Sequence, residues 1–433
     1  MALELRSKPL KKGQKGKELD SRWFDENEWK ASREADAEQW KAHLKTGAIR
    51  IVPQGEAKSV DESRILPIPS RFVRTNKDKS GGLMPKSRLV VPGHLAPSGE
   101  VRTDAPVAPQ FALYILLSMV ALCGWTLGTF DVADAFLSGE NNSRRLYVRP
   151  PREGIPGVPD GSLLELVKGV FGLKESPRLW WLKLQKTVLD CGFTAVRGVP
   201  GVFLFKEPAK GQSTGQVVGM LVVHVDDGCW AGTGPHFERA QTKLRKGLAI
   251  GKEASGTFEL LGRRVTHNEH GVKVDQHDYI MKVKHIDVAR VRRREKDSPL
   301  TNTERTQYLS LVQQLSWPAR STLPALCYHV SALQQRAAQA TVADLVAANK
   351  ALDEARSMVQ RDMCLWFKAG AFTVEELMVT AVHDASFANE TNRGSQQGCL
   401  VTVGPKNSLE EAKEYSLFLI DWSSIKLRSI STV

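Results

Sequence analysis

Several features that define large classes of proteins are absent from this sequence. Its 433 residues include six cysteines, which have neither the paired spacing of a zinc site nor the density of a disulfide framework. This pattern favours a reducing compartment. The apolar stretch at residues 111–122 is too short to span a bilayer, and the charged first residues lack a secretory hydrophobic segment. Together these absences predict an intracellular protein without a membrane partner.

An excess of acidic residues is also missing, because 60 Lys and Arg residues outweigh 48 Asp and Glu residues and give a net charge of +12. Such a balance suits a polyanionic partner such as nucleic acid. The basic residues form two clusters, the first with Lys8, Lys11, Lys12, Lys15 and Lys17 and the second with Lys282, Lys284, Arg290, Arg292, Arg293, Arg294 and Lys296. We expect the first in a basic, disordered tail of residues 1–35. The second fits either a surface that follows a nucleic-acid backbone or a solvated linker.

Two adjacent carboxylates end a strongly apolar segment. Asp226 and Asp227 follow residues 217–223, which have the composition of a buried strand, and residues 228–232 resemble a return strand. Ionised carboxylates at such a place are costly unless a cation or hydrogen-bond donors compensate them. A divalent metal ion at the tip of a hairpin is the simplest answer, although Asp-Asp-Gly is also an ordinary solvated turn sequence.

A third carboxylate strengthens the metal hypothesis. Asp131 ends another strand-like stretch, at residues 125–131. Nucleotidyl transfer by two metal ions requires carboxylates that converge from separate strands. Asp131, Asp226 and Asp227 meet that requirement and are our candidates for catalysis and for metal binding.

The motifs around these aspartates resemble those of the reverse transcriptase of copia-type long-terminal-repeat retrotransposons. Asp131 begins Asp-Val-Ala-Asp-Ala-Phe-Leu, and the paired aspartates stand in His-Val-Asp-Asp, where the family has Tyr-Val-Asp-Asp. The most specific match is the segment of residues 170–180, Val-Phe-Gly-Leu-Lys-Glu-Ser-Pro-Arg-Leu-Trp. Further matches occur in order at residues 69–74, 86–93, 104–107, 146–151, 261–262, 276–280 and 308–315, so the resemblance covers residues 36–433.

The resemblance implies an α+β fold of the right-hand polymerase type, with fingers, palm and thumb and an antiparallel palm sheet covered by helices. Residues 36–280 would form the fingers and palm, residues 281–370 the thumb and connection, and residues 377–433 an incomplete ribonuclease H-like α/β domain. Apolar residues with helical spacing predict helices from residue 179 onward and at residues 237–248. A hairpin is expected at residues 265–274, and in the family such a hairpin lies close to the primer terminus.

Nucleotide binding is assigned to residues that flank the first aspartate in the sequence. Lys86 and Arg88 are two positions apart, which on a strand places both cations on one face, suited to a triphosphate; two solvated charges are the alternative. In the family, an aromatic residue at the position of Phe136 blocks the 2′-hydroxyl of a ribonucleotide, whereas a core Phe is equally compatible with the sequence. Gly172 and Lys174 lie in a helix-entry loop that either packs against template and nucleotide or simply starts a helix.

Arg178 and His224 are our candidates for contacts with primer and template. Arg178 belongs to the most specific match, and His224 occupies the position of the family tyrosine. On an extended strand His224 would share a face with Asp226, close to primer or template. Imidazole forms hydrogen bonds but offers less stacking area than a phenol ring, which predicts weaker or altered polymerisation.

A second set of family motifs occurs near the carboxyl end. Residues 379–388 and 393–398 resemble the opening strands of the family's ribonuclease H domain, and Asp384 matches its first metal ligand. The family's catalytic glutamate would come just beyond Val433. With one carboxylate of a multi-carboxylate site, we expect no ribonuclease H activity from this chain and regard Asp384 as a vestigial ligand.

The resemblance therefore predicts an RNA-directed DNA polymerase of a retrotransposon Pol polyprotein, using two Mg²⁺ ions or Mn²⁺ as a substitute. Its partners would be an RNA template, a DNA primer or RNA–DNA hybrid, dNTPs and other Pol-derived chains. It would act in the cytoplasm, in virus-like particles or with access to the nucleus. Two alternatives stay open: a truncated or host-retained relic that binds nucleic acid without turnover, and an unrelated two-metal phosphohydrolase. The latter leaves the ordered matches around Lys86 and Gly172 unexplained.

Overall fold

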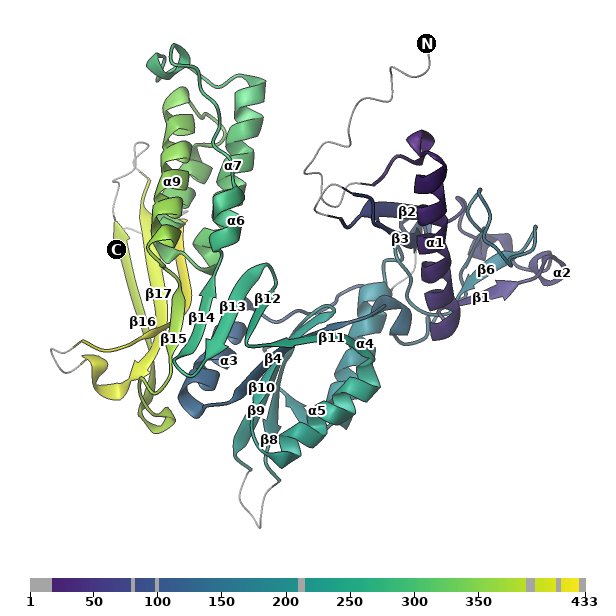
Figure 1. The fold of residues 1–433 in the computed structure, drawn as a ribbon, viewed down its shortest axis with the longest axis horizontal. Coiled ribbons are helices and arrows are strands. Elements are labelled where there is room, and N and C mark those ends of the chain that lie inside the picture. The colour runs from purple at the N-terminus through teal and green to yellow at the C-terminus, as the bar shows by residue number, and fades with distance from the viewer. Residues whose placement is uncertain are drawn as a thin grey trace. The chain divides into compact units, whose positions relative to one another are not determined.

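The chain forms two compact units, each assembled from segments that are distant in sequence. The computed structural model describes residues 18–78, 82–97, 101–208, 215–386, 394–409 and 414–427. Unit 1 comprises residues 1–106, 132–192 and 243–249, and unit 2 comprises residues 107–131, 193–242 and 250–433. Both units combine helices with antiparallel strand pairs, as Figure 1 shows, and the predicted α+β class is confirmed.

Unit 1 contains two small sheets beside a long helix. Its elements are α1 (Glu26–Thr46), β1 (Ile49–Val52), α2 (Gln54–Ala57), β2 (Arg71–Asn76), β3 (Pro85–Val90), β5 (Tyr147–Val148), β6 (Leu163–Leu166) and α4 (Ser176–Asp190). Strands β2 and β3 pair with each other, and β1, β6 and β5 form the second sheet in that order. Trp40, Phe72, Leu89 and Leu164 belong to the buried apolar cluster between these elements.

Helix α1 begins inside the segment for which disorder was predicted. The side chain of Asp25 accepts a hydrogen bond from the backbone N–H of Glu28 (2.9 Å), and the Glu28 carboxylate accepts one from the N–H of Asp25 (2.8 Å). This reciprocal cap satisfies two otherwise unpaired donors and favours helix initiation. The predicted tail of residues 1–35 is therefore wrong for residues 26–35, and residues 1–17, with the first lysine cluster, lie outside the described part of the chain.

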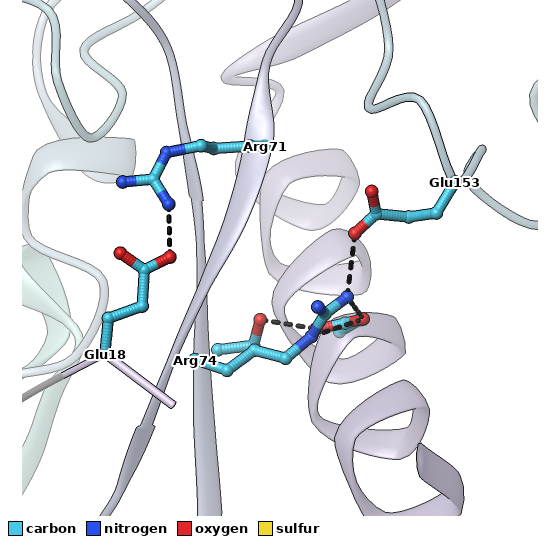
Figure 2. A network of polar contacts seen from close by, with 6 residues as sticks. Glu18, Arg71, Arg74 and Glu153 are labelled. Atoms are coloured by element: carbon cyan, nitrogen blue, oxygen red, sulfur yellow. Dashed lines mark hydrogen bonds and ion pairs between the residues drawn. The ribbon is translucent and has the colours of Figure 1, made fainter. Parts of the chain in front are cut away.

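A buried polar network attaches α1 to the β2–β3 pair (Figure 2). The Arg74 guanidinium donates to Asp36 at 2.6 Å and to Glu153 at 2.9 Å, and the Ser87 hydroxyl donates to Asp36 at 2.5 Å. Figure 2 also shows the ion pair between Glu18 and Arg71. Burying charges is costly unless they are paired and hydrogen-bonded, and here the Asp36 carboxylate has both kinds of partner. The network turns one face of β3 toward the helix.

Unit 2 holds the remaining elements, except that β4 and α5 end in unit 1. They are α3 (Gln110–Cys123), β4 (Thr126–Val132), β7 (Phe193–Ala195), β8 (Val202–Lys206), β9 (Val217–His224), β10 (Asp227–Gly232), α5 (Pro235–Leu248), β11 (Ile250–Ser255), β12 (Thr257–Leu260), β13 (Arg263–Asn268), β14 (Gly271–Asp275), α6 (His277–Lys282), α7 (Asn302–Ser321), α8 (Cys327–Arg336), α9 (Val342–Gln360), β15 (Leu365–Lys368), β16 (Leu377–Ser386), β17 (Gln396–Pro405) and β18 (Phe418–Lys426). The helices expected near residues 179 and 237–248 and the hairpin at 265–274 are confirmed as α4, α5 and β13–β14.

The central sheet of unit 2 has the strand order β11-β4-β10-β9-β8-β7. Helix α3 packs on one face, where Val222 and Cys229 join its apolar cluster. Phe237 of α5 packs on the other face against Gly219 and Gly232, at which an added Cβ would lie 2.4 and 2.6 Å from its ring. The two glycines therefore allow the ring to approach the backbone of β9 and β10.

Two further sheets share the apolar cluster of α3. Strands β12, β13, β14 and β15 form one, and β16, β17 and β18 form the other, in those orders. Helices α6 to α9 enclose a separate apolar cluster. No helix in the described ranges is both long and apolar enough to cross a membrane.

Candidate active site

Backbone register brings two of the three predicted aspartates together. In the β4–β10 ladder Asp227 lies opposite Asp131, and in the β9–β10 ladder it lies opposite His224. Residues directly opposite in antiparallel strands have Cβ atoms about 4.5–5.5 Å apart and project from the same face. His224, Asp227 and Asp131 therefore form a row across three neighbouring strands of unit 2. Because Val222 and Cys229 lie one step further along the same face, this is the face that α3 covers.

Val225 and Asp226 form the two-residue turn that joins β9 to β10. Val225 has a φ of +61°, whereas Asp226 does not have a positive φ. This pattern is that of a type II′ turn, in which glycine is usual at the first central position. A β-branched residue there is strained, at a cost of about 1–3 kcal/mol. The sequence predicted that His224 shares a face with Asp226, but β9 ends at His224, so its partner across the hairpin is Asp227 instead.

The three carboxylates repel one another. Burial, followed by the negative charges of Asp226 and Asp131, raises the pKa of Asp227 to about 6. A bound cation would relieve both causes, because it compensates the lost hydration and separates the like charges. The donors are hard carboxylate oxygens without a thiolate, which suits Mg²⁺ or Mn²⁺.

The three carboxylates do not form a complete coordination site by their side-chain positions in the described residues. In the ranges that the structure describes, no group of three or more His, Cys, Asp or Glu side chains could hold a metal ion as it stands. The ligand set therefore rests on the register of Asp131 and Asp227 and on the donor chemistry. Asp226, in the turn, is exposed.

A cavity of about 180 Å³ lies beside this row, and His224 and Asp227 are among its lining residues. The β12–β13 hairpin forms another wall, with Leu261 in its two-residue turn. Leu261 and Gly262 have φ values of +48° and +71°, as in a type I′ turn. A Cβ on Gly262 would lie 2.4 Å from the Trp317 ring of α7, so the glycine lets that ring hold the tip of the hairpin.

Sequence reasoning missed a buried cation in this cavity. Arg263 is 6% exposed and donates to the side-chain oxygens of Gln110 (2.8 Å) and Ser321 (3.1 Å), while its Nε has no hydrogen-bond partner. The spacing in the sequence could have indicated this. Arg263 and Val265 are two positions apart on β13, so their side chains project from the same face, and Val265 is buried.

In unit 1 two of the predicted nucleotide-binding residues, Lys86 and Arg88, share one face of β3. Lys86 and Arg88 point away from α1, because Ser87 and Leu89, which alternate with them along the strand, are buried toward it. The guanidinium of Arg88 lies 5.4 Å from the centre of the Phe171 ring, and Phe171 meets Phe136 edge to face at 5.8 Å. Burial, together with the charges of Lys77 and Arg88, lowers the pKa of Lys86.

Phe171 was not predicted as a site residue, and Gly172 explains how it is positioned. Gly172 has a φ of +93°, and a Cβ there would lie 2.1 Å from the carbonyl oxygen of Val91. The Val91 N–H in turn donates to the carbonyl of Phe171 (2.9 Å). Glycine therefore allows this loop to lie against the end of β3, and Lys174 in the same loop is exposed.

The positions of Arg178 and Asp384 do not by themselves indicate a function. Arg178 is ion-paired with Asp104 at 3.2 Å. Asp384 is exposed on β16 and lies opposite Gly398 in the β16–β17 ladder, which continues to Ser424 in β18. The roles assigned to Arg178 and Asp384 stay predictions.

Comparison with known proteins gives a family for the chain. The model of the family described as reverse transcriptase (RNA-dependent DNA polymerase) matches residues 60–292. The retrovirus-related Pol polyprotein from transposon RE1 of Arabidopsis thaliana is 25% identical over 289 residues, 63% of this chain and 19% of that protein. The corresponding polyprotein from transposon RE2 is 28% identical over 161 residues, 36% of this chain and 10% of that protein. This chain thus spans a small part of both relatives.

Two further similarities cover more of the chain. A transposon Ty5-1 protein of Saccharomyces cerevisiae is 26% identical over 320 residues, 70% of this chain and 94% of that protein. Among solved structures, a foamy viral protease-reverse transcriptase in complex with double-stranded DNA is 12% identical, with a TM-score of 0.46 over 88% of this chain and 53% of that chain. A structural similarity of that size does not by itself establish a shared fold.

Proposed function

Because this chain belongs to the reverse transcriptase family, we propose that it is an RNA-directed DNA polymerase of a copia-type retrotransposon Pol polyprotein. The observation that supports this activity most directly is the placement of Asp131 opposite Asp227, beside the turn that carries Asp226. The chain belongs to a polymerase family, and this register supports an acidic site of the kind that nucleotidyl transfer requires. The primer 3′-hydroxyl attacks the α-phosphate of an incoming dNTP and pyrophosphate leaves.

Asp131, Asp226 and Asp227 would hold two Mg²⁺ ions, with Mn²⁺ as a substitute. When bound, these ions supply positive charge to the triphosphate and acidify the primer hydroxyl. The raised pKa of Asp227 supports this assignment, because its causes are burial and, after it, the charges of Asp226 and Asp131, and a bound cation offsets both. Because Asp227 is partly buried, less water solvates its carboxylate, and a bound ion would take the place of that water.

Lys86 and Arg88 would bind the triphosphate of the incoming nucleotide. Their common face on β3 and the Phe171 ring beneath Arg88 support this role, because the ring holds the guanidinium in one orientation. Phe136, whose ring meets Phe171, would exclude a 2′-hydroxyl. Gly172 and Lys174 would complete the nucleotide site.

The larger assignments follow the same family. Residues 36–280 would be the fingers and palm, residues 281–370 the thumb and connection, and residues 377–433 a ribonuclease H-like domain, with Asp384 at the position of its first metal ligand. His224 and Arg178 would contact primer and template, and the partners would be an RNA template, a DNA primer and dNTPs.

Primer extension tests the proposal. Purified protein, a DNA primer on an RNA template, dNTPs and Mg²⁺ should give extended products, and Asp227→Asn should lose them. Asp160→Asn, which changes an exposed carboxylate in unit 1, is the matched control and should extend normally. Binding of the hybrid without extension in Mg²⁺ or Mn²⁺ would instead identify a relic that retains only the nucleic-acid surface.

A further inference from the structure

A groove of about 330 Å³ lies in unit 2 outside the candidate active site. Helices α7 and α8 form one side and strand β18 forms the other. Two cations, Arg320 and Lys426, line it together with amide and hydroxyl side chains, and among the described residues that line it there is no carboxylate. Both cations are exposed, and in the described part of the chain neither forms an ion pair. The charge of the groove is therefore left for a ligand.

Two of the hydroxyl groups in the groove accept hydrogen bonds from a buried amide, which leaves their O–H groups to act as donors. Gln396 is 5% exposed, and its Nε2 donates to the hydroxyls of Ser331 (3.0 Å) and Ser424 (2.8 Å). Gln335 fixes the orientation of Gln396 by donating to its Oε1 at 2.9 Å. A hydroxyl that has accepted a hydrogen bond still has its own O–H to donate. The groove thus presents cations and hydroxyl donors, which match the oxygens of an anion.

The groove is tied to the catalytic cavity through one short segment of α7. Gln110, which lines the cavity, donates to the carbonyl of Arg320, and Arg263 donates to the hydroxyl of Ser321. On the other side, the indole N–H of Trp422 in β18 donates to the carbonyl of Ala319 at 2.7 Å. Residues 319–321 are therefore hydrogen-bonded both to two residues that line the cavity and to β18, so one short segment of α7 links the groove to the cavity that contains Asp227.

We propose that this groove binds the phosphodiester backbone of a nucleic-acid strand, as a contact additional to the polymerase site. The inference rests on the proposed function, because the strand is the template or primer of that reaction. Arg320 and Lys426 each contact one phosphate, and Ser331 and Ser424 donate to phosphate oxygens of the same strand. A repeating anion fits better than an isolated one, because two separate cations line a groove that is open to solvent.

Salt-dependent binding tests the groove directly. A labelled RNA–DNA hybrid is titrated with the full chain in EDTA at several KCl concentrations, and binding is followed by fluorescence anisotropy. Each phosphate contact contributes about 0.9 to the slope of log K against log[KCl]. The double variant Arg320→Gln, Lys426→Gln should therefore lower the slope by about 2, with weaker binding at every salt concentration. Both side chains are exposed, so the variant should fold normally.

A matched control removes the same net charge elsewhere in unit 2. Lys350→Gln with Lys368→Gln, both exposed, should lower the slope by less than half as much. Equal slopes for the two double variants would overturn the proposal, since general charge would then explain the binding. One other outcome would overturn the proposal. If polyglutamate competes for binding to the native chain, and the groove variant binds the hybrid as tightly as the native chain does, the groove is a site for an acidic peptide.

Extension assays keep this inference separate from the proposed function. If Asp227→Asn loses extension but retains the full salt slope, the two sites act independently, as the inference requires. If the native chain fails to extend primers while the groove variant still loses slope, the proposed activity is wrong and the nucleic-acid groove stands. If extension is normal and the slope is unchanged in the groove variant, the groove assignment alone is wrong.

Discussion

Asp227 lies directly opposite Asp131 in the β4–β10 ladder, so the register of the two strands determines which carboxylates are neighbours. Gly228, the next residue of β10, preserves this pairing, because a Cβ there would lie 2.1 Å from the ring of Phe130 in β4. Phe130 and Trp230 fill the opposite face of the sheet at a ring separation of 4.6 Å. Aromatic packing on the opposite face of the sheet therefore supports the row of His224, Asp227 and Asp131, and it leaves no room for a side chain at Gly228.

The raised pKa of Asp227 predicts that this carboxylate destabilises the metal-free protein at neutral pH. Its folded-state pKa of about 6 lies above the ordinary aspartate value of 3.8, so the folded state binds the proton more tightly. Stability linked to this group is present below about pH 4 and is lost as the pH rises through about 6. Allowing for the partial exposure of the side chain, Asp227→Asn should stabilise the apo protein by about 1–2 kcal/mol at pH 7.

Urea denaturation in EDTA measures this difference. The gain of Asp227→Asn over the native chain should be full near pH 7 and should disappear near pH 4, because the native carboxyl is then protonated and uncharged. A difference that does not depend on pH would contradict the stated cause. Added Mg²⁺ should reverse the order at pH 7, since the native carboxylate then gains a cation that the amide binds poorly.

The strained backbone at Val225 predicts a trade-off between stability and activity. Val225→Gly should stabilise the chain by about 1 kcal/mol, because release of the left-handed strain exceeds the greater backbone entropy that glycine loses on folding. Primer extension should nevertheless decrease, because a glycine turn fixes Asp226 less firmly. Thermal unfolding and extension rates test the two effects on the same preparations. Ala249→Gly is the control, because Ala249 also has a left-handed φ (+49°) but is exposed and does not line the cavity that contains Asp227.

Local patterns predicted the elements that carry the site. The β9–β10 hairpin and the β13–β14 hairpin have apolar strands separated by short turns, and α5 has apolar residues at helical spacing. Each of these signals is contained within a few neighbouring residues, so no knowledge of the rest of the fold is needed. The same locality made the aspartates recognisable as strand-end residues.

The identity of the residues that meet could not be read from local patterns. Asp227, rather than Asp226, pairs with Asp131 because β10 begins one residue earlier than the Gly228 expected from the sequence. Phe171 was missed because its contact with Arg88 joins segments more than 80 positions apart. The start of α1 was missed because lysine-rich composition outweighed the capping pair of Asp25 and Glu28. Register and tertiary contact decide such cases.

The network of Figure 2 predicts that α1 and the β2–β3 pair lose stability together. Arg74→Met leaves the Asp36 carboxylate buried without its cation and should cost about 3–5 kcal/mol in the free energy of unfolding. Adding Asp36→Leu should recover most of this loss, because no uncompensated charge then remains. Urea denaturation of both variants tests the coupling, and equal stabilities would contradict it. Arg71→Met, which breaks the exposed pair with Glu18, should cost less than about 1 kcal/mol.

The pair of rings in unit 1 predicts two separable effects on nucleotide use. Phe136→Ala should raise the incorporation of ribonucleotides relative to deoxynucleotides by about 10- to 100-fold, because the space for a 2′-hydroxyl then opens. Phe171→Ala removes the ring beneath Arg88 and should raise the KM for every nucleotide by about 2- to 5-fold without changing the ribose preference. Single-nucleotide extension with matched dNTP and rNTP series gives both ratios. If Phe136→Ala changes the KM for both sugars equally, Phe136 packs in the core of the site and does not select the sugar.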